Sequence, residues 1–171
     1  MTWRKIWPML AVSNTSPLSN LAYINRLDLL RSQFSELWIP PAVVNELQAH
    51  PDQAARSAIE AAIRDQWMRI AAPQDTPLRR MLTLHLHAGE AEAIALAADL
   101  KAGTVIIDEQ EGRALASQAG LFVTGTLGVL LQAKNLGSIE AVKPEIQALR
   151  SRTRFFLSSS LEAAVLSAAG E

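Results

Sequence analysis

The chain alternates short apolar runs with longer stretches of helical periodicity, and this alternation limits its possible folds more than any other feature. The short runs fall at residues 10–12, 37–39, 67–70, 104–107 and 121–123, and the β-branched run at 104–107 is the clearest predicted strand. Strands that alternate with helices require crossover connections and form mainly parallel sheets with helices on both faces. We therefore predict an α/β fold with three layers, α/β/α.

Length, charge and cysteine content narrow the class of protein. A chain of 171 residues is ordinary for one domain, so we expect a single domain over residues 1–171, with a core at about 10–150 and a C-terminal helical tail at 151–171. The formal charge of −1 provides no general basic field, so any nucleic-acid contact must come from local arginine patches. The sequence has no cysteine, which excludes disulfides and thiolate metal sites and fits a reducing cytosol.

The first residues and the apolar segments argue against export and against a membrane span. Residues 3–7 resemble the charged start of a signal peptide, but Pro8 breaks the apolar run that follows, and the run ends at Ser13. No segment approaches the roughly 20 apolar residues that a membrane helix needs. We expect a cytoplasmic protein that does not contact the membrane, in which Trp3 and Trp7 could dock on a partner subunit.

Polar residues follow two of the predicted strands. Asn14 comes after the run at 10–12, and Asp108 comes directly after the run at 104–107. The carboxyl ends of parallel strands meet at one edge of a sheet, and ligands bind there in such folds. This edge is therefore the predicted functional site.

Acidic residues stand where the alternation could bring them to that edge, which suggests a site for Mg²⁺. Glu46 lies in the helix after Pro41, Glu90 and Glu92 lie in an alanine-rich helix, and Asp108 ends a strand. Residues two apart point to nearly opposite sides of a helix, so only one of Glu90 and Glu92 can face the site. We favour Glu92, because Glu90 can be explained by the preference for acids in the first helical turn. A solvated Glu46 and a helix-capping Asp108 remain alternative interpretations.

Five sequence blocks resemble one known family in their order and spacing. They are VSNTSPLSNLAYINRLDLL, WIPPAVVNEL, GEAEAIALA, VIIDEQEGRALA and VTGTLGVLLQAK. Together they resemble the VapC-related branch of the PIN-domain superfamily, from about residue 10 to 150. The resemblance implies a PIN-like α/β/α fold and a Mg²⁺- or Mn²⁺-dependent ribonuclease of the toxin type. It also implies an RNA substrate, a small antitoxin protein as partner and a homodimer.

The same resemblance assigns residues to the site. The family's four acidic positions fall at Asn14, Glu46, Glu92 and Asp108, which are the expected metal ligands. Ser16 falls at a small polar position near the metal and, with those four, makes up the predicted catalytic set. Arg113 falls in a matching motif, where it could contact phosphate or pair with an acid.

Asn14 departs from the family pattern, because an amide stands where an acid is expected. An amide oxygen can bind a hard cation but contributes no negative charge, so metal affinity should fall. A second function therefore stays open: a weakened or inactive PIN-like module that binds an antitoxin-like protein or RNA. A phosphate-accepting receiver domain is disfavoured, because it needs an acid after the first strand. His85 and His87, two residues apart, do not share a helix face and are not favoured as metal ligands.

Overall fold

A computed structural model describes residues 10–171, and the signal-like residues 3–7 with Trp3 and Trp7 lie outside this range. The five predicted strands form one parallel sheet of order β3-β2-β1-β4-β5. Its strands are β1 (Leu10–Ser13), β2 (Glu36–Ile39), β3 (Met68–Ile70), β4 (Thr104–Ile106) and β5 (Phe122–Thr124). Within the described range no helix is long and apolar enough to cross a membrane.

The central strands are buried on both faces, as their continuous apolar runs predict. In β1, Ala11 belongs to one apolar core and Val12 to the other, both with no exposed surface. The same alternation holds in β4, where Val105 and Ile106 face opposite cores. The sheet therefore forms the middle layer of a three-layer α/β/α fold, as predicted.

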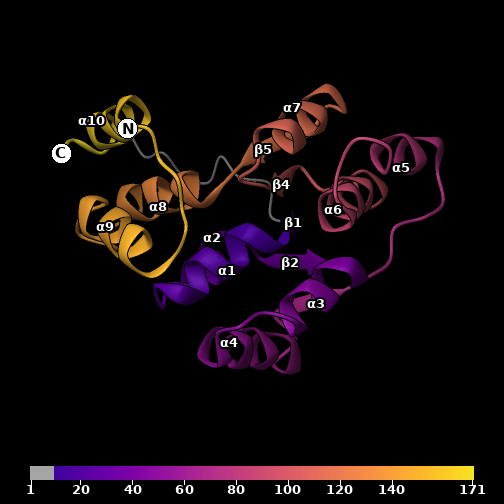
Figure 1. Cartoon of the computed structure of the whole chain (residues 1–171), viewed down its shortest axis with the longest axis horizontal. Helices are drawn as coiled ribbons and strands as arrows, with labels where there is room; N and C mark the ends of the chain where they lie inside the picture. The colour runs from indigo at the N-terminus through magenta and orange to yellow at the C-terminus, as the bar shows by residue number, and fades with distance from the viewer. Residues whose placement is uncertain (1–9) are drawn as a thin grey trace.

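One core lies between the sheet and the helices α1 (Thr15–Tyr23), α2 (Asp28–Gln33), α8 (Thr126–Asn135) and α9 (Lys143–Arg152). The other core is covered by α5 (Pro77–Leu82), α6 (Ala88–Asp99) and α7 (Gln110–Gln118). Figure 1 shows these two groups of helices on opposite sides of the strands. The predicted division of helices between the two faces is thus observed.

The remaining helices complete these layers. The helix α3 (Pro41–Gln48) lies between α1 and α6, and α4 (Gln53–Arg64) packs beside α1. The C-terminal α10 (Ser159–Ala169) packs on α8 through Val165 and Leu166, which contact the first core. The position of α3 is important for the site, because it carries Glu46 between two helices that begin at the same edge of the sheet.

Candidate metal centre and adjoining groove

The candidate site lies where β1 and β4 end side by side. The chain runs from β1 to β2 on one side of the sheet and later enters β4 on the other, which makes the crevice between β1 and β4 the usual ligand position in open α/β folds. A hydrogen bond of 3.0 Å from the Asn14 backbone nitrogen to the Ile106 carbonyl joins the two strand ends. The segment after β1 and the segment after β4 therefore meet, as the sequence predicts.

Asn14 is the residue through which the first strand enters its helix. It is 3% exposed and caps α1, with its side-chain oxygen accepting a hydrogen bond from the Thr15 backbone. Its amide nitrogen Nδ2 donates to Glu109 Oε2 at 3.0 Å. Ser16 Oγ donates to the other oxygen of the same carboxylate. Two polar side chains of the first segment thus hold Glu109, an acid that no sequence motif assigns to the site.

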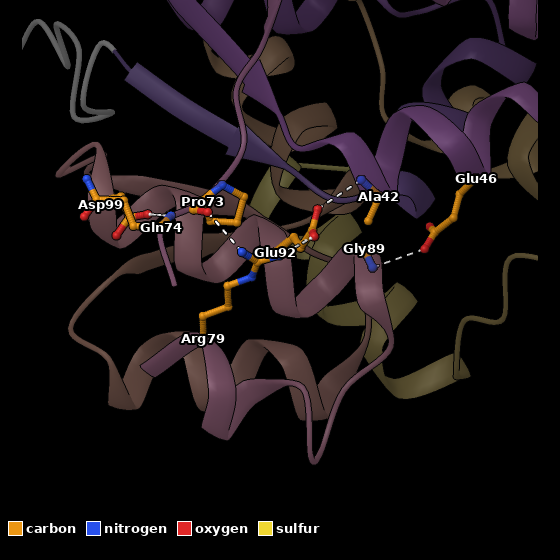
Figure 2. A network of polar contacts seen from close by, with 8 residues as sticks. All are labelled: Ala42, Glu46, Pro73, Gln74, Arg79, Gly89, Glu92 and Asp99. Carbon is orange, nitrogen blue, oxygen red and sulfur yellow. Dashed lines mark hydrogen bonds and ion pairs between the residues drawn. The ribbon is translucent and has the colours of Figure 1, made fainter. Parts of the chain in front are cut away.

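Glu46 reaches this region from α3. Its carboxylate accepts hydrogen bonds from the Thr15 hydroxyl and, at 3.1 Å, from the Gly89 backbone nitrogen at the start of α6 (Figure 2). A Cβ atom at residue 89 would lie 2.7 Å from both carboxylate oxygens of Glu46. A glycine at 89 is therefore needed for this close approach, and the fit joins α3 to α6 beside Asn14.

Glu90 is the most deeply buried acid of the site, with 6% of its surface exposed. Its carboxylate accepts a hydrogen bond of 3.3 Å from the His87 backbone nitrogen. Burial raises the pKa of Glu90, and the nearby charge of Glu109 raises it further. Gly112 on α7 leaves room for this side chain, since a Cβ there would lie 3.0 Å from Glu90 Oε1.

Glu92 lies in a different set of contacts from the other acids. It forms an ion pair of 2.8 Å with Arg79 of α5, and its second oxygen accepts a hydrogen bond of 3.0 Å from the Ala42 backbone nitrogen. Figure 2 shows Glu92 directed toward these two partners. Glu90 and Glu92 do point in different directions, as their spacing predicts, but Glu90 rather than Glu92 accompanies Asn14.

Asp108 precedes Glu109 in the chain, and its carboxylate is held by a different set of hydrogen bonds from that of Glu109. Its Oδ1 accepts from the Thr126 backbone nitrogen at 2.7 Å, and its Oδ2 accepts from Thr126 Oγ1 at 2.6 Å and from Asn20 Nδ2 at 3.0 Å. Burial raises the pKa of Asp108, and these three hydrogen bonds partly oppose the rise. The side chain therefore fixes the start of α8. The alternative interpretation from the sequence is a cap on the helix that directly follows Asp108, whereas the observed partner lies eighteen residues further along the chain.

Two concave regions share the wall formed by Thr15, Ser16 and Glu109. The smaller is a pocket of about 450 Å³ that contains the polar first segment and three acids. Its lining is Asn14, Thr15, Ser16, Glu46, His87, Ala88, Glu90 and Glu109. The larger is a groove of about 1480 Å³ that contains Asp108 and runs toward the C-terminal segment. Asn14, Ser16 and Glu46 therefore meet in the pocket, Asp108 lies in the groove, and Glu92 lines neither.

The acids of the site form no ion pairs in the described part of the chain, although His87 lies close enough to Glu90 to offset part of the rise that burial gives the pKa of its carboxyl. Among the residues described, Glu46, Glu90, Asp108 and Glu109 form no ion pair, whereas Glu92 is paired with Arg79. Arg113 donates to the Ile107 carbonyl at 2.9 Å and forms no ion pair with an acid. A divalent cation would relieve both the mutual repulsion and the cost of burying Glu90.

The donor set fits a hard cation that keeps part of its water shell. Within residues 10–171 no three acidic or histidine side chains converge closely enough to enclose an ion by themselves. Mg²⁺ usually takes only one or two carboxylates and fills its other positions with water and phosphate. The buried Glu90, the adjacent Glu109 and the amide oxygen of Asn14 are oxygen donors of this kind. The residues present therefore suit Mg²⁺ or Mn²⁺ bound by few protein ligands.

Comparison with known families agrees with this description. The profile of the family described as DUF3368: PIN domain matches residues 10–171, and the chain belongs to the PIN-domain family. This match confirms the superfamily that the five sequence blocks predict. The PIN domain is a nuclease-type fold that generally depends on divalent metal and suggests a nucleic-acid substrate. No significant match was found among curated proteins.

Proposed function

We propose that this PIN domain is a divalent-metal-dependent endoribonuclease of the toxin type that hydrolyses RNA phosphodiester bonds. The observation that carries the proposal is the group of acids near the ends of β1 and β4, which have hydrogen-bond donors around them but form no ion pair among the described residues. Such a group is costly to maintain unless a cation offsets its charge. A small antitoxin as partner and a homodimer are further predictions from the family resemblance, and a cytoplasmic location is a prediction from the sequence composition and the short apolar runs.

In this proposal the cation is held by Glu90 and Glu109, with Asn14 Oδ1 as a neutral ligand and Glu46 beside them. The bound cation supplies an activated water and offsets the negative charge that develops on the phosphate. Ser16 and Asn14 orient the Glu109 carboxylate through the hydrogen bonds described above. Glu90 replaces Glu92 as the acid contributed by α6, because Glu92 is occupied by Arg79 and by the start of α3.

Asp108 contributes to this proposal from the groove side. Its three hydrogen bonds fix the position of Thr126 and hence the first turn of α8. The backbone N–H groups of a helix start favour anions. Asp108 therefore acts as a positioning residue for the edge of the groove next to Glu109.

One observation favours the second function, a weakened module that binds RNA or an antitoxin-like protein. The amide nitrogen of Asn14 already donates to Glu109 at 3.0 Å, so part of the stabilisation that a cation would give is provided by the chain itself. A carboxylate at residue 14 could not donate this hydrogen bond. The two functions differ in whether the pocket still binds metal and cleaves RNA.

The experiment that decides between them measures cleavage of a fluorescently labelled single-stranded RNA by the full chain in Mg²⁺, Mn²⁺ or EDTA. We expect cleavage only with a divalent cation, and a loss of at least about tenfold in Glu90→Gln, which removes a charged ligand. Glu60→Gln is the matched control, because Glu60 is an exposed acid on α4. Glu92→Gln tests whether Glu92 rather than Glu90 is the metal ligand on α6, and we expect this variant to retain cleavage.

Each outcome has a defined meaning. Cleavage by the wild-type protein that survives in Glu90→Gln and disappears in Glu92→Gln would restore the assignment made from the sequence. Wild-type protein that neither cleaves RNA with any divalent cation nor shows a metal-dependent thermal shift would contradict the nuclease proposal and favour the binding module.

A further inference from the structure

The larger groove is bounded by a part of the chain that the acidic site does not use. Residues 153–157 connect α9 to α10 without regular secondary structure and form one wall of the groove. Arg152, the last residue of α9 before this segment, donates a hydrogen bond of 3.4 Å from Nη1 to the Tyr23 carbonyl at the end of α1. The groove and the smaller pocket share Thr15, Ser16 and Glu109 in their linings, so a molecule lying in the groove contacts the wall of the acidic site at one end.

Three arginines line the groove together with the acids Asp108 and Glu109. They are Arg113, Arg152 and Arg154, and none of them belongs to an ion pair among residues 10–171. Arg113 and Arg152 donate only to backbone carbonyl groups. Neighbouring Arg150, by contrast, pairs with Glu162 at 2.6 Å and does not line the groove. Three of the described arginines that form no ion pair therefore line one groove, whereas Arg31 and Arg56, which also form none, lie outside it.

The same segment exposes an aromatic ring. Phe156 lines the groove and is 90% exposed, which makes it the most exposed large apolar side chain of the described residues. Its neighbours Phe155 and Leu157 contact the first core, so the segment is anchored on both sides of Phe156. An exposed phenylalanine on an anchored segment, next to unpaired arginines, matches the arrangement by which proteins stack bases and contact phosphates of a single strand.

We propose that this groove binds single-stranded RNA, with phosphates against Arg113, Arg152 and Arg154 and a base stacked on Phe156. The strand then places a phosphodiester at the wall of Thr15, Ser16 and Glu109. This inference rests on the proposed function, which it extends by assigning the path of the substrate and the side chains that contact it. Duplex RNA cannot make the same contacts in the groove, because its bases are stacked on one another and cannot stack on Phe156.

Charge favours this occupant over a protein segment. A polyanion meets three guanidinium groups along the groove, and its phosphate near Glu109 suits the cation of the proposed pocket. A peptide of ordinary composition offers no such regular series of negative charges. A protein partner in the groove is therefore the alternative that the experiment must separate from RNA.

The test is a fluorescence anisotropy titration of a labelled single-stranded RNA with the full chain in EDTA, where cleavage does not interfere, repeated at several salt concentrations. We expect Phe156→Ala to weaken binding about fivefold or more through loss of stacking. We expect Arg154→Gln to weaken binding and to lower the slope of log affinity against log salt by about one. Duplex RNA of the same sequence should bind more weakly than the single strand.

Two substitutions of the same kind provide matched controls. Phe122→Ala removes an exposed phenylalanine of β5 that is 69% exposed and does not line the groove. Arg31→Gln removes an exposed arginine of α2 that also lies outside it. Both control variants should bind RNA as the wild-type protein does.

The outcomes for the groove and for the nuclease are distinguishable. Equal RNA binding by wild type, Phe156→Ala and Arg154→Gln would overturn the groove proposal, and so would equal affinity for the duplex or absence of RNA binding. The nuclease proposal would stand in those cases if metal-dependent cleavage is observed. Binding that depends on Phe156 and Arg154 in a protein that never cleaves would support the groove and contradict the nuclease.

Discussion

Replacing Asn14 by aspartate changes one contact and keeps the rest of the site. Aspartate is as good a helix cap as asparagine, so the hydrogen bond from the Thr15 backbone is retained. The donor to Glu109 at 3.0 Å is lost, and two carboxylates face each other instead. A hydrogen bond to a charged group contributes about 1.5–3 kcal/mol. Repulsion at this distance has an upper limit of about 5 kcal/mol at an effective dielectric constant of about 20, and rotation or protonation reduces it. Without metal, Asn14→Asp should therefore destabilise the fold by about 2–4 kcal/mol.

The same variant should respond more strongly to metal than the wild-type protein does. In EDTA we expect its melting temperature to fall by roughly 5–15 °C, as a protein of this size loses about 2–4 °C per kcal/mol. Mn²⁺ at 100 times its dissociation constant should restore about 2.7 kcal/mol. Thermal and urea unfolding of both proteins, with and without Mn²⁺, measure these values.

The control for this substitution is Asn45→Asp, the same change at an exposed position of α3. It should alter the free energy of unfolding by no more than about 0.5 kcal/mol. If Asn14→Asp melts within about 2 °C of wild type in EDTA and Mn²⁺ does not shift it, the Asn14 amide does not stabilise an acidic pair, and the reasoning fails.

Three further substitutions test other contacts of the site. The raised pKa of Glu90 means that its neutral form favours the fold, so its contribution is largest below the ordinary pKa of 4.5 and is lost as pH rises through the raised value. Glu90→Gln should then gain stability relative to wild type with rising pH in EDTA, and a pH-independent difference in urea unfolding would contradict this. Arg79→Gln should lower the free energy of unfolding by about 1–2 kcal/mol, because it breaks the partly buried ion pair with Glu92, and should leave RNA cleavage per folded molecule unchanged. Its control is Arg80→Gln, which breaks an exposed ion pair with Asp75 and should change the free energy of unfolding little. Gly125→Ala should displace Asp108, because its Cβ would lie 2.6 Å from Asp108 Oδ1 and 3.0 Å from a backbone oxygen that cannot move away; full stability with unaltered RNA cleavage would refute this.

The fold could be predicted from the sequence because its signals are local. Each strand corresponds to a short apolar run in the sequence, and the β-branched run at 104–107 corresponds to a strand that is buried on both faces. The alternation with helices then requires crossovers and a parallel sheet. The order of the strands is a tertiary property: helices on both faces imply that the chain switches direction somewhere in the sheet, and the structure places this switch at β1.

Site residues could be predicted only where the strand or helix that carries them is enough to place them. Asn14 follows a strand, and the structure brings it together with Ser16 and Glu46 in the pocket. The choice between Glu90 and Glu92 depends on Arg79, which lies thirteen residues before Glu92 and on another helix. No local pattern reveals such a partner.

The role of Glu109 was missed for a related reason. Adjacent residues after a strand point in different directions, and here Asp108 turns toward Thr126 while Glu109 turns toward Asn14. The polar cluster at residues 13–16 was the available signal, because several donors close together need an acceptor. The structure supplies that acceptor from the segment after β4.

The wall that separates the pocket from the groove would couple the two proposed ligand positions thermodynamically. Glu109 has one face toward each of them, so a cation on one side and a polyanion on the other alter the same carboxylate. Linkage requires such effects to be equal in both directions. If Mn²⁺ tightens RNA binding by a given factor, RNA must tighten Mn²⁺ binding by the same factor, and Glu109→Gln should reduce both factors together.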